Sequence, residues 1–150
     1  MFDAIRKMAD NAKQLTSEVL LEVAFNTSDL DSLIIHLNTE KQLFEGVNSL
    51  NIELSTIGGG YSPTTIRIKE SKGQPTDKVT LKDTSDFYKS FEVSISQGDL
   101  IIEADTIKAG QDLQERWGDD LLGLTEASKD ELIEFLIPIL QEIIIEKLFE

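Results

Sequence analysis

The chain has 150 residues, of which 40% are hydrophobic and 28% charged, and this balance predicts a single globular domain spanning residues 1–150. It contains no cysteine, which excludes disulfides, thiolate metal sites and cysteine nucleophiles. The net charge of −14 opposes general binding to nucleic acid, because contacts to phosphate dominate that affinity.

The first part of the chain predicts two helices. Apolar residues recur at steps of three and four over residues 3–24, which predicts one amphipathic helix. Charges throughout MFDAIRKMADNAKQ argue against a signal peptide. Ser28 and Asp31 mark the expected start of a second helix, whose apolar face comprises Leu30, Leu33, Ile34 and Leu37.

Residues 39–54 predict a short helical segment followed by a strand. Thr39 and Gln42 have the spacing of a capping box, which places Leu43 and Phe44 inward and makes Gly46 the stop. The period then changes to two, since apolar and polar residues alternate. This alternation predicts a strand carrying Leu50, Ile52 and Leu54.

Three consecutive glycines, 58–60, interrupt that strand. Neither a P-loop nor a dinucleotide fingerprint fits, because Tyr61 follows the run, the first lysine is Lys69, and the glycines are contiguous rather than spaced. We interpret the run as a turn that leads into the next helix. Ser62 can cap this helix, Pro63 suits its first turn and Gly73 should end it.

The segment 79–118 predicts short elements. Residues 79–81 should form a short strand, and residues 83–91 a turn with one helical turn that stacks Phe87 near Phe91. The stretches FEVSIS and LIIEA, separated by QGD, predict a β-hairpin. Residues 112–117 should form a short helix that ends at Gly118.

The last element is a predicted helix that starts at Thr125 or Ser128 and continues to the end. Ser128 and Glu131 have capping-box spacing, and Pro138 should kink the helix near Glu134. Its apolar stripe is wide for one helix, so we expect core packing, with coverage by a neighbouring subunit as the alternative. The segment LIEFLIPILQEIII is too short and too polar to span a membrane. The elements together predict an α+β fold: a small antiparallel sheet with a β-hairpin, flanked by N-terminal helices and a long C-terminal helix.

Positive charge is concentrated in one short segment of this acidic chain. Residues 61–82 hold five of the 14 basic side chains and only two acidic ones. Such asymmetry favours contact with an acidic surface, including another copy of the chain, although a solvated basic loop is the alternative. We predict an interaction surface over residues 61–82, and the candidate residues are Tyr61, Arg67, Lys69, Lys72, Lys78, Lys82 and Trp117. Trp117 lies outside that range and is either a core residue or an interface anchor.

No set of residues compels an enzyme, a metal or a cofactor. His36 is the single histidine and has no partner four residues away, so zinc is not expected. Carboxylates at 103–105 and 117–120 lack the alternating spacing of a calcium loop. Asp83-Thr84-Ser85 is similar to the Asp-Thr-Gly of aspartic proteases, but serine replaces the glycine; a turn is the preferred interpretation, and a diverged dimeric aspartic hydrolase a remote alternative.

Two stretches resemble proteins of tailed bacteriophages. The first is QLFEGVNSLNIELSTIGGGYSPTTIRIKESKGQPTDKVTLKDTSDFYKSFEV, and the second is GDDLLGLTEASKDELIEFLIPIL. Both are similar to virion-morphogenesis and tail-completion (head–tail joining) proteins, and the resemblance covers roughly residues 40–145. Ser85 departs from the pattern, which has glycine at that position.

The resemblance implies a non-enzymatic structural protein in the neck or tail of a virion assembled in the host cytoplasm. Its partners would be copies of itself in a ring and portal, neck or tail proteins. DNA would only pass through a lumen whose walls carry the acidic residues, and no membrane or cofactor is expected. The alternative is a soluble acidic binding module, such as a regulator that mimics DNA.

Overall fold

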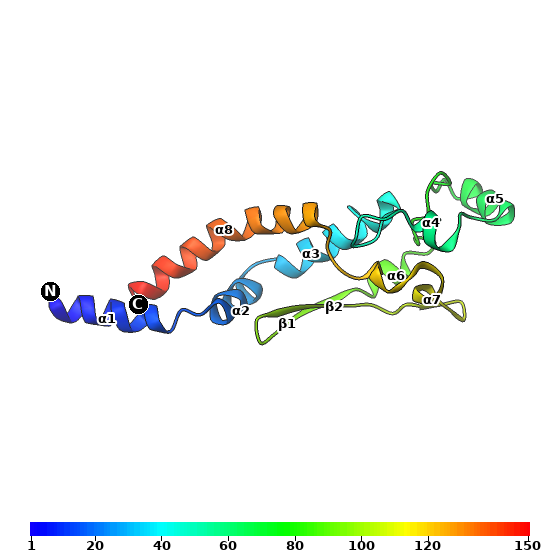
Figure 1. The fold of residues 1–150 in the computed structure, drawn as a ribbon. Helices are drawn as coiled ribbons and strands as arrows, with labels where there is room; N and C mark the ends of the chain where they lie inside the picture. Colours follow the sequence, from blue (N-terminus) through cyan, green and yellow to red (C-terminus); the bar gives the residue numbers. More distant parts are fainter.

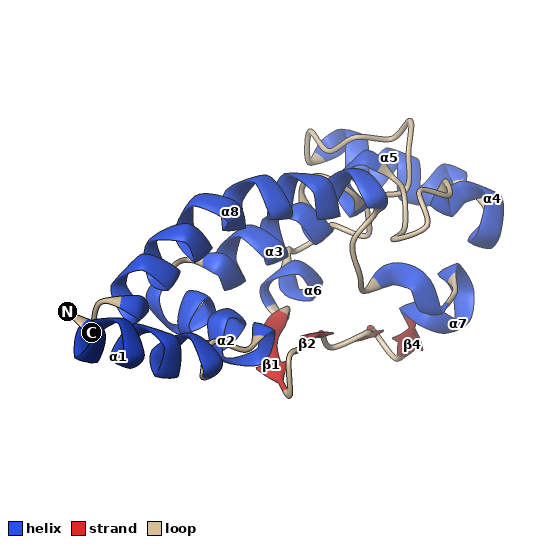
Figure 2. Ribbon diagram, turned by 60° about the vertical axis from the view of Figure 1, so that its left-hand side comes forward, coloured by secondary structure: helices blue, strands red, loops and turns tan.

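The computed structural model describes residues 1–150 as an elongated α+β molecule with both termini at one end (Figure 1). Helix α8 lies on one side of α2 and α3, and the β1–β2 hairpin lies on the other side (Figures 1 and 2). The elements in chain order are α1 (Phe2–Lys13), α2 (Ser17–Thr27), α3 (Leu30–Thr39), the 3₁₀ turn η1 (Leu43–Glu45), α4 (Leu54–Gly58), α5 (Pro63–Ser71), α6 (Asp86–Lys89), β1 (Glu92–Ser96), β2 (Asp99–Glu103), β3 (Ile107–Lys108), β4 (Gln111–Asp112), α7 (Leu113–Trp117), η2 (Asp119–Leu121) and α8 (Glu126–Leu148).

The N-terminal region forms two helices, so the prediction of one helix over residues 3–24 is wrong. The chain leaves α1 after Lys13 and enters α2 at Ser17. Thr16 causes the new start, because its Oγ1 accepts a hydrogen bond from the backbone N–H of Val19 at 3.2 Å. An N-cap residue has an extended backbone, which interrupts a continuous helix even where the apolar period continues.

Helix α3 confirms the second predicted helix. Its face with Leu30, Ile34 and Leu37 is buried. The predicted capping box at Thr39 is wrong, because Thr39 is the last residue of α3 and its hydroxyl donates to the carbonyl of Ile35. The 3₁₀ turn that follows ends at Gly46, in the left-handed conformation expected of a helix stop.

The two single strands predicted before the hairpin do not form. Asn48 turns the chain, since its Oδ1 accepts hydrogen bonds from the backbone N–H groups of Leu50 and Ile52. Leu50 and Ile52 are therefore exposed, and Leu54 instead begins α4. The alternating apolar residues therefore belong to a turn in which only Leu54 is buried, and not to a strand.

Residues 79–81 are buried but pair with no strand. Side chains instead supply the backbone hydrogen bonds that a neighbouring strand would make. The backbone N–H of Thr80 donates to the Tyr61 hydroxyl at 2.9 Å, and the Tyr88 hydroxyl donates to the Thr80 carbonyl. Burial raises the pKa of the Tyr88 phenol, so this donor stays protonated. Two tyrosine hydroxyl groups thus pair with the backbone N–H and carbonyl of Thr80, in a segment that the sequence predicted to be a strand.

The other predicted elements are confirmed. Ser62 caps α5 by accepting from the Thr65 N–H, and Pro63 is its first residue. Helix α6 places the Phe87 and Phe91 rings 5.2 Å apart. Strands β1 and β2 pair antiparallel around a two-residue turn, and α7 ends before Gly118. The predicted hairpin and both short helices therefore stand.

Two apolar clusters form the interior. The larger one joins η1, α4, α6 and α7, and it contains Leu43, Leu54, Val79, Leu81, Phe87, Tyr88, Phe91, Leu113, Trp117 and Leu121. The smaller one joins α3 to the start of α8 through Leu30, Ile34, Leu37 and Leu124. Both clusters lie away from the end that holds the termini, so α1 contributes no buried residue.

Helix α8 begins at the earlier of its two predicted starts. Thr125 is the cap, and its Oγ1 accepts from the Ser128 N–H at 3.1 Å. The helix continues through Pro138 to Leu148, yet only Ser128 and Ile143 are buried. The apolar stripe is therefore divided: Leu136 packs on the smaller cluster, whereas Ile133 and Ile137 are exposed.

Ser85 has a left-handed backbone, with φ of +70°, and its side chain makes no capping hydrogen bond. Replacing Ser85 with glycine should raise the free energy of unfolding by about 0.5–1 kcal/mol, because the left-handed region is strained for residues with a Cβ. Urea denaturation would measure the change. Ser94→Gly, the same change in strand β1, should instead destabilise; a loss of stability in both variants would contradict the interpretation.

Candidate functional site

The basic surface over residues 61–82 is largely neutralised within the chain. Lys72 pairs with Asp83 at 2.7 Å, Lys78 with Glu45 at 2.8 Å and Lys82 with Glu40 at 3.2 Å. Arg67 is exposed and makes no ion pair. Lys69 is buried, with 5% of its surface exposed, so it cannot contact a flat partner surface directly. The role of this surface as an interface stays a prediction.

Aromatic rings hold the inner lysines of this surface in place. The Lys69 ammonium lies 4.7 Å from the centre of the Tyr61 ring. The Lys82 ammonium lies 5.2 Å from the Phe44 ring centre and 5.3 Å from that of Tyr88. Such cation–π contacts are attractive, so the rings fix where the ammonium groups point.

A pocket of about 270 Å³ opens between α5, the segment 81–83, β3 and α7. It brings together four of the seven predicted residues and leaves Arg67, Lys72 and Lys78 outside. Its lining comprises Tyr61, Thr65, Ile68, Lys69, Leu81, Lys82, Asp83, Lys108, Leu113 and Trp117. Sequence reasoning missed Lys108, which lies far along the chain and reaches the pocket from the second small hairpin.

Trp117 is a core residue and not an exposed anchor. It is 5% exposed, and its indole Nε1 is buried without a hydrogen-bond partner. The Arg116 guanidinium lies over its ring at 4.3 Å, while Arg116 Nε donates to the Gly58 carbonyl at 3.0 Å. The glycine run is thereby fastened to α7.

Asp83 is held as an anion. The hydrogen bond from Lys72 holds the pKa of the Asp83 carboxyl below its ordinary value. The ion pair with Lys72 gives Asp83 a structural role within one chain.

The Lys72–Asp83 pair predicts a pH effect. A depressed folded-state pKa contributes stability that is present above the unfolded value of about 4 and is lost as the pH falls through the folded pKa. Lys72→Met should therefore raise the pKa of Asp83, measured by NMR titration of its carboxyl carbon, and flatten the acid dependence of stability. Lys89→Met, at an exposed lysine without an ion pair, should leave that pKa unchanged; an equal shift in both variants would contradict the pairing.

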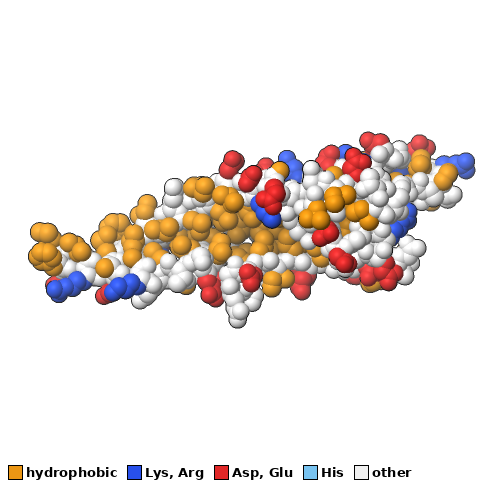
Figure 3. Space-filling view, in the orientation of Figure 1, with side chains coloured by type: hydrophobic (Ala, Val, Ile, Leu, Met, Phe, Trp, Pro, Cys, Tyr) orange, Lys and Arg blue, Asp and Glu red, His pale blue; other side chains and the backbone are white.

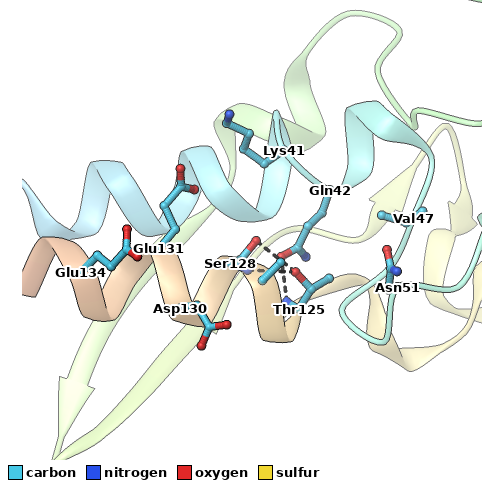
Figure 4. Close-up of a pocket in the computed structure, with 10 residues that line it drawn as sticks. Lys41, Gln42, Val47, Asn51, Thr125, Ser128, Asp130, Glu131 and Glu134 are labelled. Atoms are coloured by element: carbon cyan, nitrogen blue, oxygen red, sulfur yellow. Dashed lines mark hydrogen bonds between the residues drawn. The ribbon is translucent and has the colours of Figure 1, made fainter.

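A second hollow, of about 540 Å³, lies where α8 begins (Figure 4). At one end Gln42, Thr125 and Ser128 converge, and Thr125 is hydrogen-bonded to both of the others (Figure 4). Along α8 the lining carries Glu131 and Glu134, and it also includes Lys41, Val47, Asn51, Ala127 and Asp130. One end of the hollow is thus formed by the hydrogen-bonded junction of Gln42, Thr125 and Ser128, and its side along α8 is acidic.

That junction rests on two buried amides that sequence reasoning did not single out. Asn38 Nδ2 donates to the Leu121 carbonyl at 2.9 Å, and Asn38 Oδ1 accepts from the Gly123 N–H at 2.7 Å. Gln42 Nε2 donates to the Gly123 carbonyl at 2.8 Å, and Gln42 Oε1 accepts from the Thr125 N–H at 2.9 Å. The available signal for Asn38 was its position four residues after Ile34, on the apolar face of α3, whereas Gln42 lies beyond the end of that helix.

Exposed apolar side chains extend along the end that holds the termini. We call this the apolar arm, and Figure 3 shows hydrophobic side chains gathered over α1, α2 and α8. Its exposed members are Phe2 at 74%, Ile5 at 54%, Val19 at 38%, Ile133 at 52%, Phe135 at 39%, Ile137 at 48%, Ile145 at 61% and Phe149 at 70%. Isolated monomers rarely expose many large apolar side chains in one region.

No group of three or more histidine, aspartate or glutamate side chains is placed to share a metal ion, and His36 is exposed. None of the helices combines the length and the apolar character needed to cross a membrane. Comparison with known proteins gave no match: no family model, no curated protein and no solved structure is significantly similar to this chain.

Proposed function

We propose that this chain is a non-enzymatic structural subunit that assembles with further copies of itself. The apolar arm carries the proposal, because Ile133, Ile137 and Phe149 are about half exposed or more and no element of the same chain covers them. Because part of each side chain is already buried, covering the rest contributes roughly 1 kcal/mol for each one, before the entropic cost of association.

We further propose that the assembly belongs to the neck or tail of a tailed bacteriophage, as a tail-completion protein or a head–tail connector ring. Support for this step comes from the sequence resemblance over residues 40–145. The large negative charge suits a lumen past which DNA slides without binding. An assembled ring with a neutral or basic lumen would contradict this part of the proposal.

The mass of the purified chain in solution, at low and high salt, tests assembly. An apolar contact through the arm should persist at high salt, whereas a contact through the basic surface should weaken. Ile137→Glu should dissociate an assembly that uses the arm. Leu50→Glu is the matched control, because Leu50 is 61% exposed but lies outside the arm.

Mixing the chain with candidate partner proteins decides between the remaining outcomes. A chain that is monomeric at every concentration, and also in mixtures with portal and tail proteins, would contradict the proposed function. In that case capture of a DNA-binding protein by the acidic surface would favour the binding-module alternative. Hydrolysis of a peptide substrate, lost in Asp83→Asn, would instead favour the aspartic hydrolase.

A further inference from the structure

Lys69 is a buried cation that forms no ion pair. Its Nζ makes one protein hydrogen bond, to the Lys82 carbonyl at 3.2 Å, and no carboxylate lies within ion-pair distance. An ammonium has three N–H donors, so two of them have no acceptor in the protein. Burying a charge in this way is costly unless something pairs with it, and the Tyr61 ring offsets only part of that cost.

The side chains that line the pocket carry more positive than negative charge, which favours binding of an anion. Lys69 and Lys108 both line it, and neither makes an ion pair. The single carboxylate in the lining, Asp83, forms its ion pair with Lys72, which lies outside the pocket, and interacts with Lys69 and Lys108 only at longer range. The opening therefore presents an excess of positive charge within a chain whose net charge is −14.

The remaining lining is apolar and limits the size of a ligand. Ile68, Leu113 and Trp117 supply hydrophobic surface, and the volume of about 270 Å³ suits a group of side-chain size. Leu81 in the same lining has φ of +56°, a strained conformation of the sort found at binding sites. An anion with an apolar stem fits this lining better than inorganic phosphate does.

We propose that this pocket binds a single carboxylate carried on a short apolar stem, with Lys69 and Lys108 as the cationic ligands. A glutamate side chain of a second copy and a free small organic acid share this chemistry. The inference does not rest on the proposed function, since the pocket is complete within one chain.

Butanoate is a suitable probe, and butyramide is its neutral counterpart of matched shape. Trp117 is the only tryptophan and lines the pocket, so its fluorescence can report on binding there. At constant ionic strength, butanoate should change the fluorescence of the full chain in a saturable way, and butyramide should not. Equal responses to the two probes, or no saturable response, would overturn the proposal.

Variants assign the response to the named lysines. Lys69→Met should weaken butanoate binding about tenfold, and Lys89→Met, outside the pocket, should leave it unchanged. Because Lys69 is buried, Lys108→Gln provides a second test at a partly exposed position. Unchanged affinity in Lys108→Gln and in a folded Lys69→Met would overturn the assignment.

The source of the carboxylate follows from the mass of the chain with and without butanoate. If butanoate or Lys108→Gln dissociates an assembly, the natural ligand is a glutamate or aspartate of another copy. If the assembly is unaffected, or the chain is monomeric while butanoate still binds, the ligand is a small acid. Loss of assembly in Ile137→Glu with retained butanoate binding would separate this site from the apolar arm.

Discussion

Replacing Asn38 with aspartate should lower the free energy of unfolding by roughly 3 kcal/mol or more. The side chain is fully buried, and the substitution keeps its volume. One acceptor still faces the Gly123 N–H, but the other oxygen now faces the Leu121 carbonyl at the 2.9 Å that a donor occupied. Two acceptors then oppose each other in an interior that also penalises the new charge.

Urea denaturation followed by Trp117 fluorescence would measure this loss, because Trp117 belongs to the larger apolar cluster. Asn26→Asp is the matched control: it makes the same change at an exposed position of α2 and should alter stability by less than about 0.5 kcal/mol. Comparable losses in the two variants would show that the amide network does not anchor residues 121–125.

The second large effect is expected at Gly58. A Cβ at this position would lie 2.7 Å from the Arg116 carbonyl oxygen and from two atoms of the Trp117 indole ring. Neither the backbone of α7 nor a buried ring can move aside cheaply, so Gly58→Ala should cost about 1–3 kcal/mol. Urea denaturation would measure it, with a change in Trp117 fluorescence in the folded state.

The neighbouring glycines supply the controls. At Gly60 a Cβ meets nothing within 4 Å and the backbone is not left-handed, so Gly60→Ala should be neutral or stabilise by up to about 1 kcal/mol. Gly59 has φ of +79° and open space, so Gly59→Ala should cost about 1–3 kcal/mol through backbone strain alone. A uniform response at the three positions would mean that the run acts only as a flexible turn.

The glycine run shows what sequence reasoning could reach. Its exclusion as a phosphate loop and the helix that Ser62 and Pro63 begin both depend on local chemistry, and the helix is confirmed. The contact of Gly58 with Trp117 joins positions 59 residues apart, and no local pattern encodes it. The local signals at this run were therefore readable, whereas its packing partners were not.

The two strands that were predicted but do not form also reflect contacts that a local pattern does not show. The segment 79–81 has the composition of a strand, but its backbone partners are the hydroxyl groups of Tyr61 and Tyr88. The alternation at 50–54 is genuine, yet Asn48 bends the chain so that only Leu54 turns inward. Periodicity reports which residues are apolar, and it does not report which group satisfies the backbone.

The candidate site was predicted in part. Four of the predicted residues, Tyr61, Lys69, Lys82 and Trp117, line one pocket, while their role in a subunit interface stays a prediction. The sequence could not show that Lys72, Lys78 and Lys82 already have acidic partners, since those partners lie 11 to 42 residues away. It therefore could not separate an available cation from a neutralised one.

The amide junction has a consequence for the order of folding. Asn38 and Gln42 find their acceptors 81 to 85 residues further along the chain. Until residues 121–125 arrive, the amide of Asn38 on the buried face of α3 and that of Gln42 just beyond the helix lack these partners, and closing so long a loop carries an entropic cost. Proteins that depend on such distant contacts fold slowly for their size. Although helices predominate here, this chain should acquire its native interior late, after most of its length has been synthesised.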